Sequence, residues 1–236
     1  MTGEIKNFFV ELLFPSSCYG CKKPGTYLCK KCHTALDAFP HPLCLHCSKR
    51  APFGVLNKQC SKELGLERLF VCAPYKNDIL NRMIKDLKYK GSFKLSRPLA
   101  SFMCRYLKKE AYAKEITTHT DIVLPVPMHV KKQKLRGYNH AEHLARDISE
   151  ILSIPYAHNI IKKHKKTISQ VEAGNLAERE KNLTGSFSVP ESSLVKNKIV
   201  LLIDDVATTG STLKECAEVL RRSGAKEVWA LTLAKD

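Results

Sequence analysis

The sequence predicts an α/β fold, in which helices cover both faces of a parallel sheet, preceded by a small cysteine-rich zinc-binding module. Seven of the ten cysteines lie within the first 60 residues. From about residue 67, short apolar segments alternate with amphipathic ones, which is typical of repeated β-α-β units. One apolar segment near the C-terminus has the continuous hydrophobicity of a strand buried on both faces. The predicted boundaries are residues 1–66 for an N-terminal helix with the zinc module, and 67–236 for the α/β domain.

The composition limits the class of protein before any motif is considered. The 236 residues include 39 Lys and Arg against 23 Asp and Glu, a formal net charge of +16. Hydrophobic residues make up 44% and charged residues 26%, which excludes a disordered or collagen-like chain. The positive charge favours an anionic partner such as nucleic acid or a phosphorylated substrate, with plain solubility as the alternative.

The start of the chain bears on its location. No segment approaches the roughly 18–20 apolar residues of a membrane span, so no transmembrane segment is predicted. Glu4 and Glu11 interrupt the first apolar residues, which favours an amphipathic helix and does not fit a signal peptide. We therefore expect a cytoplasmic protein, in which cysteines are rarely joined as structural disulfides.

Two C-x2-C pairs follow this helix. They comprise Cys18, Cys21, Cys29 and Cys32. One such turn presents two thiolates to an ion, and a second turn completes a tetrahedron. The spacing therefore predicts structural Zn²⁺ at these four residues, with redox-active thiols as the alternative.

A second cysteine group follows the first and lacks one member. It comprises Cys44, Cys47 and Cys60. The sequence leaves its fourth ligand open between His41, His46 and Glu63, and an empty site is a further alternative. Spacing alone also allows the pair at 18 and 21 to combine with the pair at 44 and 47. The prediction is a second zinc site with an undetermined ligand set.

The α/β part is predicted element by element from hydrophobic periodicity. The elements are a strand at 69–73, helices at 79–87 and 95–107, a strand at 122–125 and a helix at 139–152. The strand at 122–125 leads into a proline-bounded loop. Residues 162–179 are charged and weakly periodic, which predicts a mobile loop with a short helix.

The last part of the chain carries the predicted chemistry. Residues 198–205 form a buried strand that ends in Asp204 and Asp205, and a loop of small residues, 208–212, leads into an amphipathic helix. Gly224 ends this helix, and residues 228–232 form a last strand. Free N–H groups at a helix start bind phosphate, and carboxylates accept hydrogen bonds from sugar hydroxyls. The sequence therefore predicts a site for a phosphorylated sugar.

The residues V-L-L-I-D-D-V-A-T-T-G-S-T at 200–212 resemble the phosphoribosyl pyrophosphate motif of type I phosphoribosyltransferases. Other segments are similar to the competence protein ComF family: the cysteine pairs, L-K-Y-K-G at 87–91, P-V-P-M at 125–128, R-G-Y-N at 136–139 and the stretch 170–187. The resemblance spans nearly the whole chain. It implies a type I phosphoribosyltransferase-like domain behind a double zinc ribbon-like module.

The resemblance also implies a ligand and its binding residues. Phosphoribosyl pyrophosphate with Mg²⁺ would contact Val126, Pro127, Met128, Asp204, Asp205, Ala207, Thr208, Thr209, Gly210, Ser211 and Thr212. Asp204 and Asp205 would hold the ribose hydroxyls, and Arg179, Lys165 or Lys166 would close over the pyrophosphate. Asp204, Asp205 and Arg179 are therefore the predicted catalytic residues. A threonine at position 208, where purine-salvage enzymes have a carboxylate, argues against purine salvage.

The family's role implies single-stranded DNA as a further partner, because it assists the handling of incoming DNA in natural transformation. Two basic clusters flank the predicted cleft: Lys131, Lys132, Lys134 and Arg136, and Lys162, Lys163, Lys165 and Lys166. The predicted DNA contacts are the four residues of the first cluster with Lys165 and Lys166 of the second. Tyr138 and His164 are candidate stacking groups, and a solvated loop face is the alternative for each cluster. The predicted function is a competence factor that binds DNA and phosphoribosyl pyrophosphate. An active phosphoribosyltransferase with an unidentified acceptor, or a zinc-module adaptor for other competence and DNA-processing proteins, remain alternatives.

Overall fold

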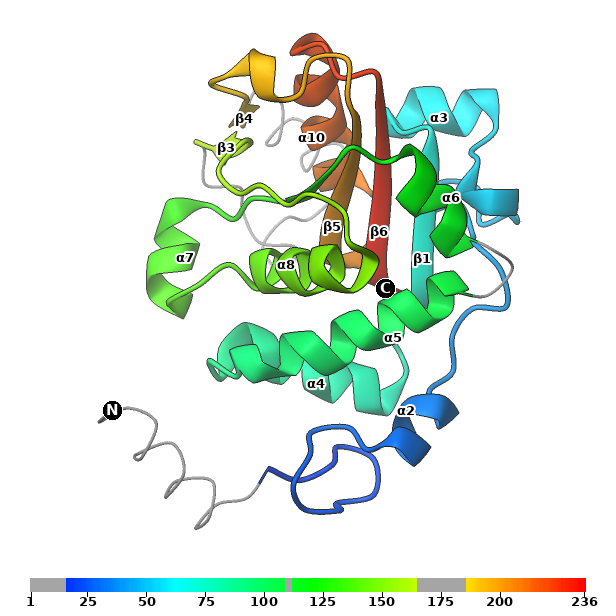
Figure 1. Ribbon diagram of the computed structural model, residues 1–236, viewed down its shortest axis with the longest axis vertical. Helices are drawn as coiled ribbons and strands as arrows, with labels where there is room; N and C mark the ends of the chain where they lie inside the picture. The colour runs from blue at the N-terminus through cyan, green and yellow to red at the C-terminus, as the bar shows by residue number, and fades with distance from the viewer. Residues whose placement is uncertain (1–15, 109–111, 165–185) are drawn as a thin grey trace.

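The computed structural model describes residues 16–108, 112–164 and 186–236 (Figure 1). Its helices are α2 (Lys30–Ala35), α3 (Lys58–Leu64), α4 (Asp78–Tyr89), α5 (Ser96–Lys108), α6 (Tyr112–His119), α7 (Val130–Arg136), α8 (His140–Leu152) and α10 (Ser211–Arg222). The short 3₁₀ turns are η1 (Pro52–Gly54), η2 (Phe93–Leu95) and η4 (Ser192–Leu194). The strands are β1 (Arg68–Pro74), β2 (Ile122–Pro125), β3 (Lys162–Lys163), β4 (Phe187–Ser188), β5 (Ile199–Ala207) and β6 (Glu227–Lys235).

The core of the described part of the chain is a four-stranded parallel sheet in the order β1-β6-β5-β2. Residues 155–157 continue it beside β2, since Val123 N donates to Pro155 O and Ala157 N donates to Val123 O. β5 lies inside the sheet, and its residues from Ile199 to Ile203 are buried without interruption. The predicted parallel α/β fold is thereby confirmed.

The two faces of the sheet have different coverings. Leu201 and Ile203 of β5 pack with α4, α5 and α8, whereas Val200 and Leu202 pack with α10. This division follows from the alternation of side chains along a strand. Figure 1 shows α4 and α5 side by side below the sheet. The carboxyl end of β5 therefore opens between α10 on one face and α8 on the other.

The cysteine-rich segments lie against both coverings. Leu28 and Leu36 join the apolar cluster of α4 and α5, and Arg105 of α5 donates to the carbonyl of Leu36. Leu45 and Leu64 join the cluster of α10. Figure 1 shows α2 beneath α4 and α5, at the end of the molecule far from β3 and β4. The first and second cysteine groups therefore support opposite faces of the same sheet.

Most predicted elements appear within two or three residues of their expected bounds. The α7 helix was missed, because its residues are polar on almost every side and His129, an unusual cap, accepts from Lys131 N. The predicted first helix and most of the loop at 162–179 lie outside the described residues. No helix of the described ranges is long and apolar enough to cross a membrane.

Candidate functional site

The loop at 208–212 ends at the first turn of α10, and Gly210 shapes it. Gly210 has φ +82° and is buried, and a Cβ at this position would lie 2.9 Å from Leu64 Cδ2 and 3.3 Å from Leu45 Cδ1. The backbone angle therefore favours glycine, and a side chain here would also force the ends of Leu64 and Leu45 to shift. The Thr209 and Ser211 hydroxyl oxygens lie 2.7 Å apart beside it. Ser211 N, the first N–H group of α10, donates to Thr209 Oγ1 at 3.4 Å. Hydroxyls and the N–H groups of a helix start thus meet at one point, which suits an anion.

Asp205 belongs to a buried ion pair. Its Oδ2 lies 2.8 Å from Lys88 Nζ and 3.2 Å from His140 Nε2, and its Oδ1 accepts from Val206 N at 2.6 Å. Burial works to raise the pKa of Asp205, but the charges of His140 and Lys88 overcome it and hold this pKa well below its usual range. Both carboxylate oxygens therefore have partners within the chain.

Asp204 differs from Asp205 in its surroundings. It is half-buried, and its Oδ1 accepts from Asp205 N at 2.9 Å. Burial and then the charge of Asp205 raise the pKa of Asp204 to about 7. The prediction gave both acids one role, and the structure gives them different surroundings: Asp205 is buried in an ion pair with Lys88 and His140, whereas Asp204 is half-buried beside it.

Lys88 and His140 are site residues that the sequence analysis did not select. Lys88 lies in the last turn of α4, and His140 is the first residue of α8. Burial works to lower the pKa of Lys88, but the attraction of Asp205 outweighs it and raises this pKa, so the ammonium is charged. Both residues lie within or next to the segments L-K-Y-K-G and R-G-Y-N, which was the only signal available.

The proline loop after β2 borders a cavity of about 330 Å³. Pro127 and Met128 line it, together with Gln133, Asn139, Glu142 and residues 157–164. Val126 does not line it. The N–H of Val126 donates to Ile203 O, and its carbonyl accepts from Asn139 Nδ2. The backbone of Val126 is therefore committed to the fold, and the predicted pyrophosphate contact there has no free group. None of the described residues of the 204–212 segment lines this cavity.

The predicted basic residues fall into three groups. Lys131 and Lys134 are exposed on α7, Lys132 and Arg136 are half-buried there, and Lys165, Lys166 and Arg179 lie outside the described residues. Of the predicted stacking groups, His164 is exposed and contacts Ser188 Oγ, but Tyr138 is half-buried and donates its hydroxyl proton to Leu87 O. Lys163, another member of the second basic cluster, is half-buried; burial lowers its pKa, and its Nζ lies 4.8 Å from the centre of the Phe187 ring.

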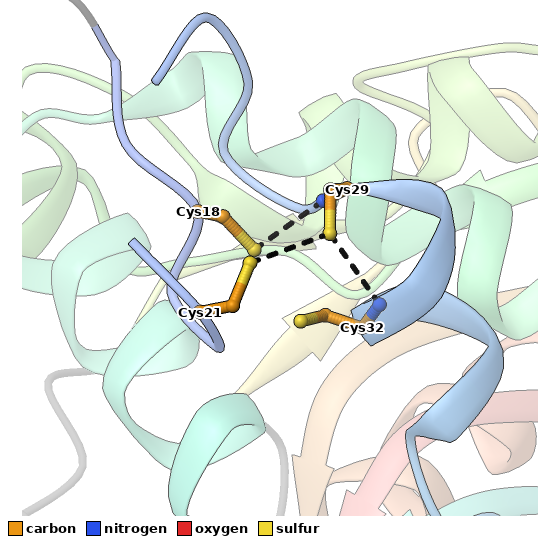
Figure 2. A group of neighbouring side chains, drawn as sticks. All are labelled: Cys18, Cys21, Cys29 and Cys32. Carbon is orange, nitrogen blue, oxygen red and sulfur yellow. Dashed lines mark hydrogen bonds between the residues drawn. The ribbon is translucent and has the colours of Figure 1, made fainter. Parts of the chain in front are cut away.

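The first cysteine group converges on one point. Figure 2 shows Cys18 and Cys21 facing Cys29 and Cys32, and all four sulfurs lie within 4.8 Å of one another. Cys21 Sγ is 3.6 Å from Cys29 Sγ, close to the roughly 3.8 Å that Zn–S bonds of about 2.3 Å require in a tetrahedron. Because Cys18 and Cys21 group with Cys29 and Cys32, the alternative in which they combine with Cys44 and Cys47 is excluded.

The protonation of this group also suits a cation. Burial works to raise the pKa of Cys18, but backbone N–H groups lower it to about 6, whereas burial and the neighbouring sulfurs raise the pKa of Cys32 to about 12. Four adjacent thiolates thus need a positive ion to coexist. All ten cysteines lie in the described ranges and are free. The donor set fits zinc, which would be held by four thiolates with no open position.

The second group also forms. The sulfurs of Cys44, Cys47 and Cys60 lie within 4.8 Å of one another, so they too could hold a metal such as zinc. Within the described chain, none of His41, His46 and Glu63 joins them at that distance. The predicted candidates for the fourth ligand are therefore not brought to the cluster.

Comparisons with known proteins agree with this geometry. A family model described as "Phosphoribosyl transferase domain" matches residues 136–236. Competence protein F of Haemophilus influenzae is 31% identical over 215 residues, which cover 88% of this chain and 90% of that protein. DNA utilization protein YhgH of Escherichia coli K12 is 28% identical, covering 93% and 98%, and competence protein ComFC of Streptococcus pneumoniae is 24% identical, covering 88% and 87%.

The matched domain contains α8, β5, the loop at 208–212 and α10, which are elements of the candidate site. The similarity to competence protein F extends over almost the full length of both proteins. This chain therefore belongs to the competence protein F family and carries a phosphoribosyltransferase-like domain.

Proposed function

We propose that this chain is a cytoplasmic competence factor that binds phosphoribosyl pyrophosphate at the 208–212 loop and single-stranded DNA on a neighbouring surface. The names of its relatives, which refer to competence and DNA utilization, support the role in DNA handling. The observation that carries the sugar-phosphate part is the buried Gly210 turn at the start of α10. This glycine lets the chain turn sharply from β5 into α10, and the start of such a helix is a common place for a phosphate group to bind.

In this proposal the 5-phosphate lies on residues 208–212, and the ribose hydroxyls donate to Asp204. Asp205 positions Lys88 and His140 beside the sugar and does not bind it directly, because its oxygens are already engaged. Mg²⁺ would neutralise charge on the pyrophosphate. Mg²⁺ prefers oxygen ligands. The cluster of His140, Asp204 and Asp205 already pairs with the Lys88 ammonium. The ion is therefore assigned to the pyrophosphate oxygens and not to this cluster.

The DNA surface is proposed to be an aromatic platform, defined as Tyr89, Phe93, Arg136 and His143. Tyr89 is 68% exposed and Phe93 is 52% exposed, which is unusual for large rings. Arg136 lies 4.7 Å over the Tyr89 ring, and Phe93 stacks on His143 at 5.7 Å. Exposed rings beside cations are the contacts that proteins use for unpaired bases and their phosphates.

The platform and the sugar-phosphate site share two chain segments. At the end of α4, Lys88 turns inward to Asp205 while Tyr89 faces solvent. Across from it, Arg136 lies on Tyr89 while His140 reaches Asp205. The Tyr138 hydroxyl ties the two segments by donating to Leu87 O. Single-stranded DNA bound on the platform would therefore lie next to the sugar-phosphate site, and Lys131 and Lys134 of α7 would add positive charge.

Calorimetric titration with phosphoribosyl pyrophosphate and Mg²⁺ tests the first part. We expect wild-type binding, loss with Gly210→Ala and at least about tenfold weaker binding with Asp204→Asn, since a hydrogen bond to a charged group contributes about 1.5–3 kcal/mol. Equal affinity of all three proteins would refute the assignment of the loop.

Fluorescence anisotropy with labelled oligothymidine tests the second part. Replacing Tyr89 and Phe93 by Ala should weaken binding at least about tenfold, because each base–ring stack contributes about 1–3 kcal/mol. Phe53→Ala on η1, where the ring is 48% exposed, is the matched control and should leave affinity unchanged. Lys131→Glu with Lys134→Glu should reduce the salt dependence. Unchanged DNA affinity in the Tyr89/Phe93 variant would exclude the platform and leave the first part standing.

A second candidate is an active phosphoribosyltransferase with an unidentified acceptor. The cavity of about 330 Å³ beside Pro127 and Met128 favours it, because such a volume accommodates a small cyclic acceptor. Release of pyrophosphate that depends on Asp204 would support transfer. Binding without release, over a panel of bases and nucleosides, would contradict it.

A further inference from the structure

The turns that begin the two cysteine groups have the same backbone structure. Lys22 N donates to Cys18 O at 2.9 Å, and Ser48 N donates to Cys44 O at 3.0 Å. Lys22 and Ser48 both have positive φ, at 65° and 56°. Three further backbone contacts recur at corresponding residues. Cys18 N donates to Lys23 O as Cys44 N donates to Lys49 O, and Gly25 N donates to Ser16 O as Ala51 N donates to Pro42 O. An antiparallel bridge joins Ser17 to Pro24 in the first turn and Leu43 to Arg50 in the second.

The second halves of the groups correspond as well. Cys29 precedes α2 with φ/ψ of −70°/158°, and its side chain accepts from Cys32 N. Asn57 precedes α3 with φ/ψ of −63°/159°, and its side chain accepts from Cys60 N. Each cap is followed three residues later by a cysteine, in the sequences C-K-K-C and N-K-Q-C. Asn57 thus stands in the second group where Cys29 stands in the first.

We propose that Cys44, Cys47 and Cys60 form a second zinc site of the same architecture, in which Asn57 takes the place of the fourth cysteine. The ion would be held by three thiolates, with the fourth position left to the Asn57 amide oxygen or to water. Zinc in proteins is held by thiolate, imidazole and carboxylate groups, and a neutral amide is a poor substitute. The second ion is therefore the more exchangeable of the two.

The position of this site gives its occupancy a consequence. Leu45 lies between Cys44 and Cys47, and Leu64 ends the helix that carries Cys60. These two leucines are the side chains that would meet a Cβ on Gly210. The Lys235 ammonium also donates to Ser48 Oγ at 2.9 Å, which ties the turn to the end of β6. Loss of the ion would loosen the packing behind the loop at 208–212.

A reciprocal exchange of ligands tests the proposal on the full chain. Zinc would be counted by atomic emission, and its release to a chromophoric chelator followed over time, for the wild type, Asn57→Cys and Cys29→Asn. We expect two zinc equivalents in the wild type, one released at least about tenfold faster, since weaker changes around a metal already cost about 10–100-fold in affinity. In Asn57→Cys both zinc ions should be released slowly to the chelator, and in Cys29→Asn both should be released rapidly.

Asn57 is exposed, so its replacement is not expected to prevent folding. Cys60→Ser should remove only the labile equivalent. One equivalent in both the wild type and Asn57→Cys would overturn the proposal, as would two equivalents released at the same rate before and after the Asn57→Cys change. Since the readout is zinc, either result leaves the proposed sugar-phosphate and DNA sites unaffected.

Discussion

Replacing Lys88 by Met tests whether the inward lysine is the main partner of Asp205. The Nζ and Oδ2 atoms are 2.8 Å apart, and the two side chains are 18% and 4% exposed. At an effective dielectric constant of about 20, this separation gives an attraction of about 6 kcal/mol, much of which the cost of burying both charges offsets. Removing one partner leaves an uncompensated buried charge, which typically costs about 3–5 kcal/mol.

Because His140 stays near the carboxylate, we expect the lower end of that range, about 3 kcal/mol in the free energy of unfolding. For a chain of this length the loss corresponds to about 6–12 °C in the midpoint of thermal unfolding. The assay is urea unfolding in excess zinc, followed by circular dichroism. Adding Asp205→Asn to Lys88→Met should recover at least about 2 kcal/mol, since no charge is then left without a partner.

Lys90→Met is the matched control, on the same helix. Lys90 pairs with Asp86 at 3.0 Å, but its side chain is 70% exposed, so the change should cost about 0.5 kcal/mol or less. A loss for Lys88→Met as small as for Lys90→Met would refute the reasoning. A double variant no more stable than the single one would refute it equally.

Three other predictions concern the loop, the acid and the metal. Gly210→Ala should destabilise the fold by about 2–4 kcal/mol in urea unfolding, because φ is +82° and the new Cβ would lie 2.9 Å from Leu64 Cδ2. Since burial and the charge of Asp205 raise the pKa of Asp204 to about 7, the folded chain holds a proton that the unfolded chain releases above about pH 4. The stability that this proton contributes is complete below about pH 4 and is lost as pH rises to 7, by at most about 1.4 kcal/mol per pH unit. Asp204→Asn should remove this contribution from the slope of the free energy of unfolding against pH, measured by urea unfolding between pH 5.5 and 7. Cys32→Ser should abolish the tightly held zinc and lower the melting temperature measured by calorimetry, whereas Cys72→Ser, at a buried cysteine that belongs to neither group, should leave the zinc content unchanged.

The sequence predicted the fold well because its signals are local. Helical spacing marks α4 and α8, and the continuous hydrophobicity of 199–203 marks a strand inside a parallel sheet. The sequence did not predict α7, because this helix has no buried residues and therefore no hydrophobic periodicity to detect. Element boundaries shifted by a few residues where caps, such as Asn77 on α4, decide the first turn.

The site was predictable in its residue types and not in its contacts. The motif at 200–212 selected the loop proposed to bind the sugar phosphate, but no local pattern says that Lys88 reaches a strand more than a hundred residues away. The different surroundings of Asp204 and Asp205 follow from strand geometry, since neighbouring side chains point to opposite faces. The repeat of the cysteine groups was hidden because one ligand position holds Asn57, and only the backbone contacts reveal the correspondence.

The leucines that flank the cysteines make the N-terminal third difficult to remove. Leu28 and Leu36 fill the underside of α4 and α5, while Leu45 and Leu64 fill the space beside α10. A fragment beginning at residue 67 would expose apolar surface on two opposite sides at once, and it should aggregate when expressed alone. Preparation of the phosphoribosyltransferase-like domain for crystallisation should therefore retain both cysteine groups and supply zinc during refolding.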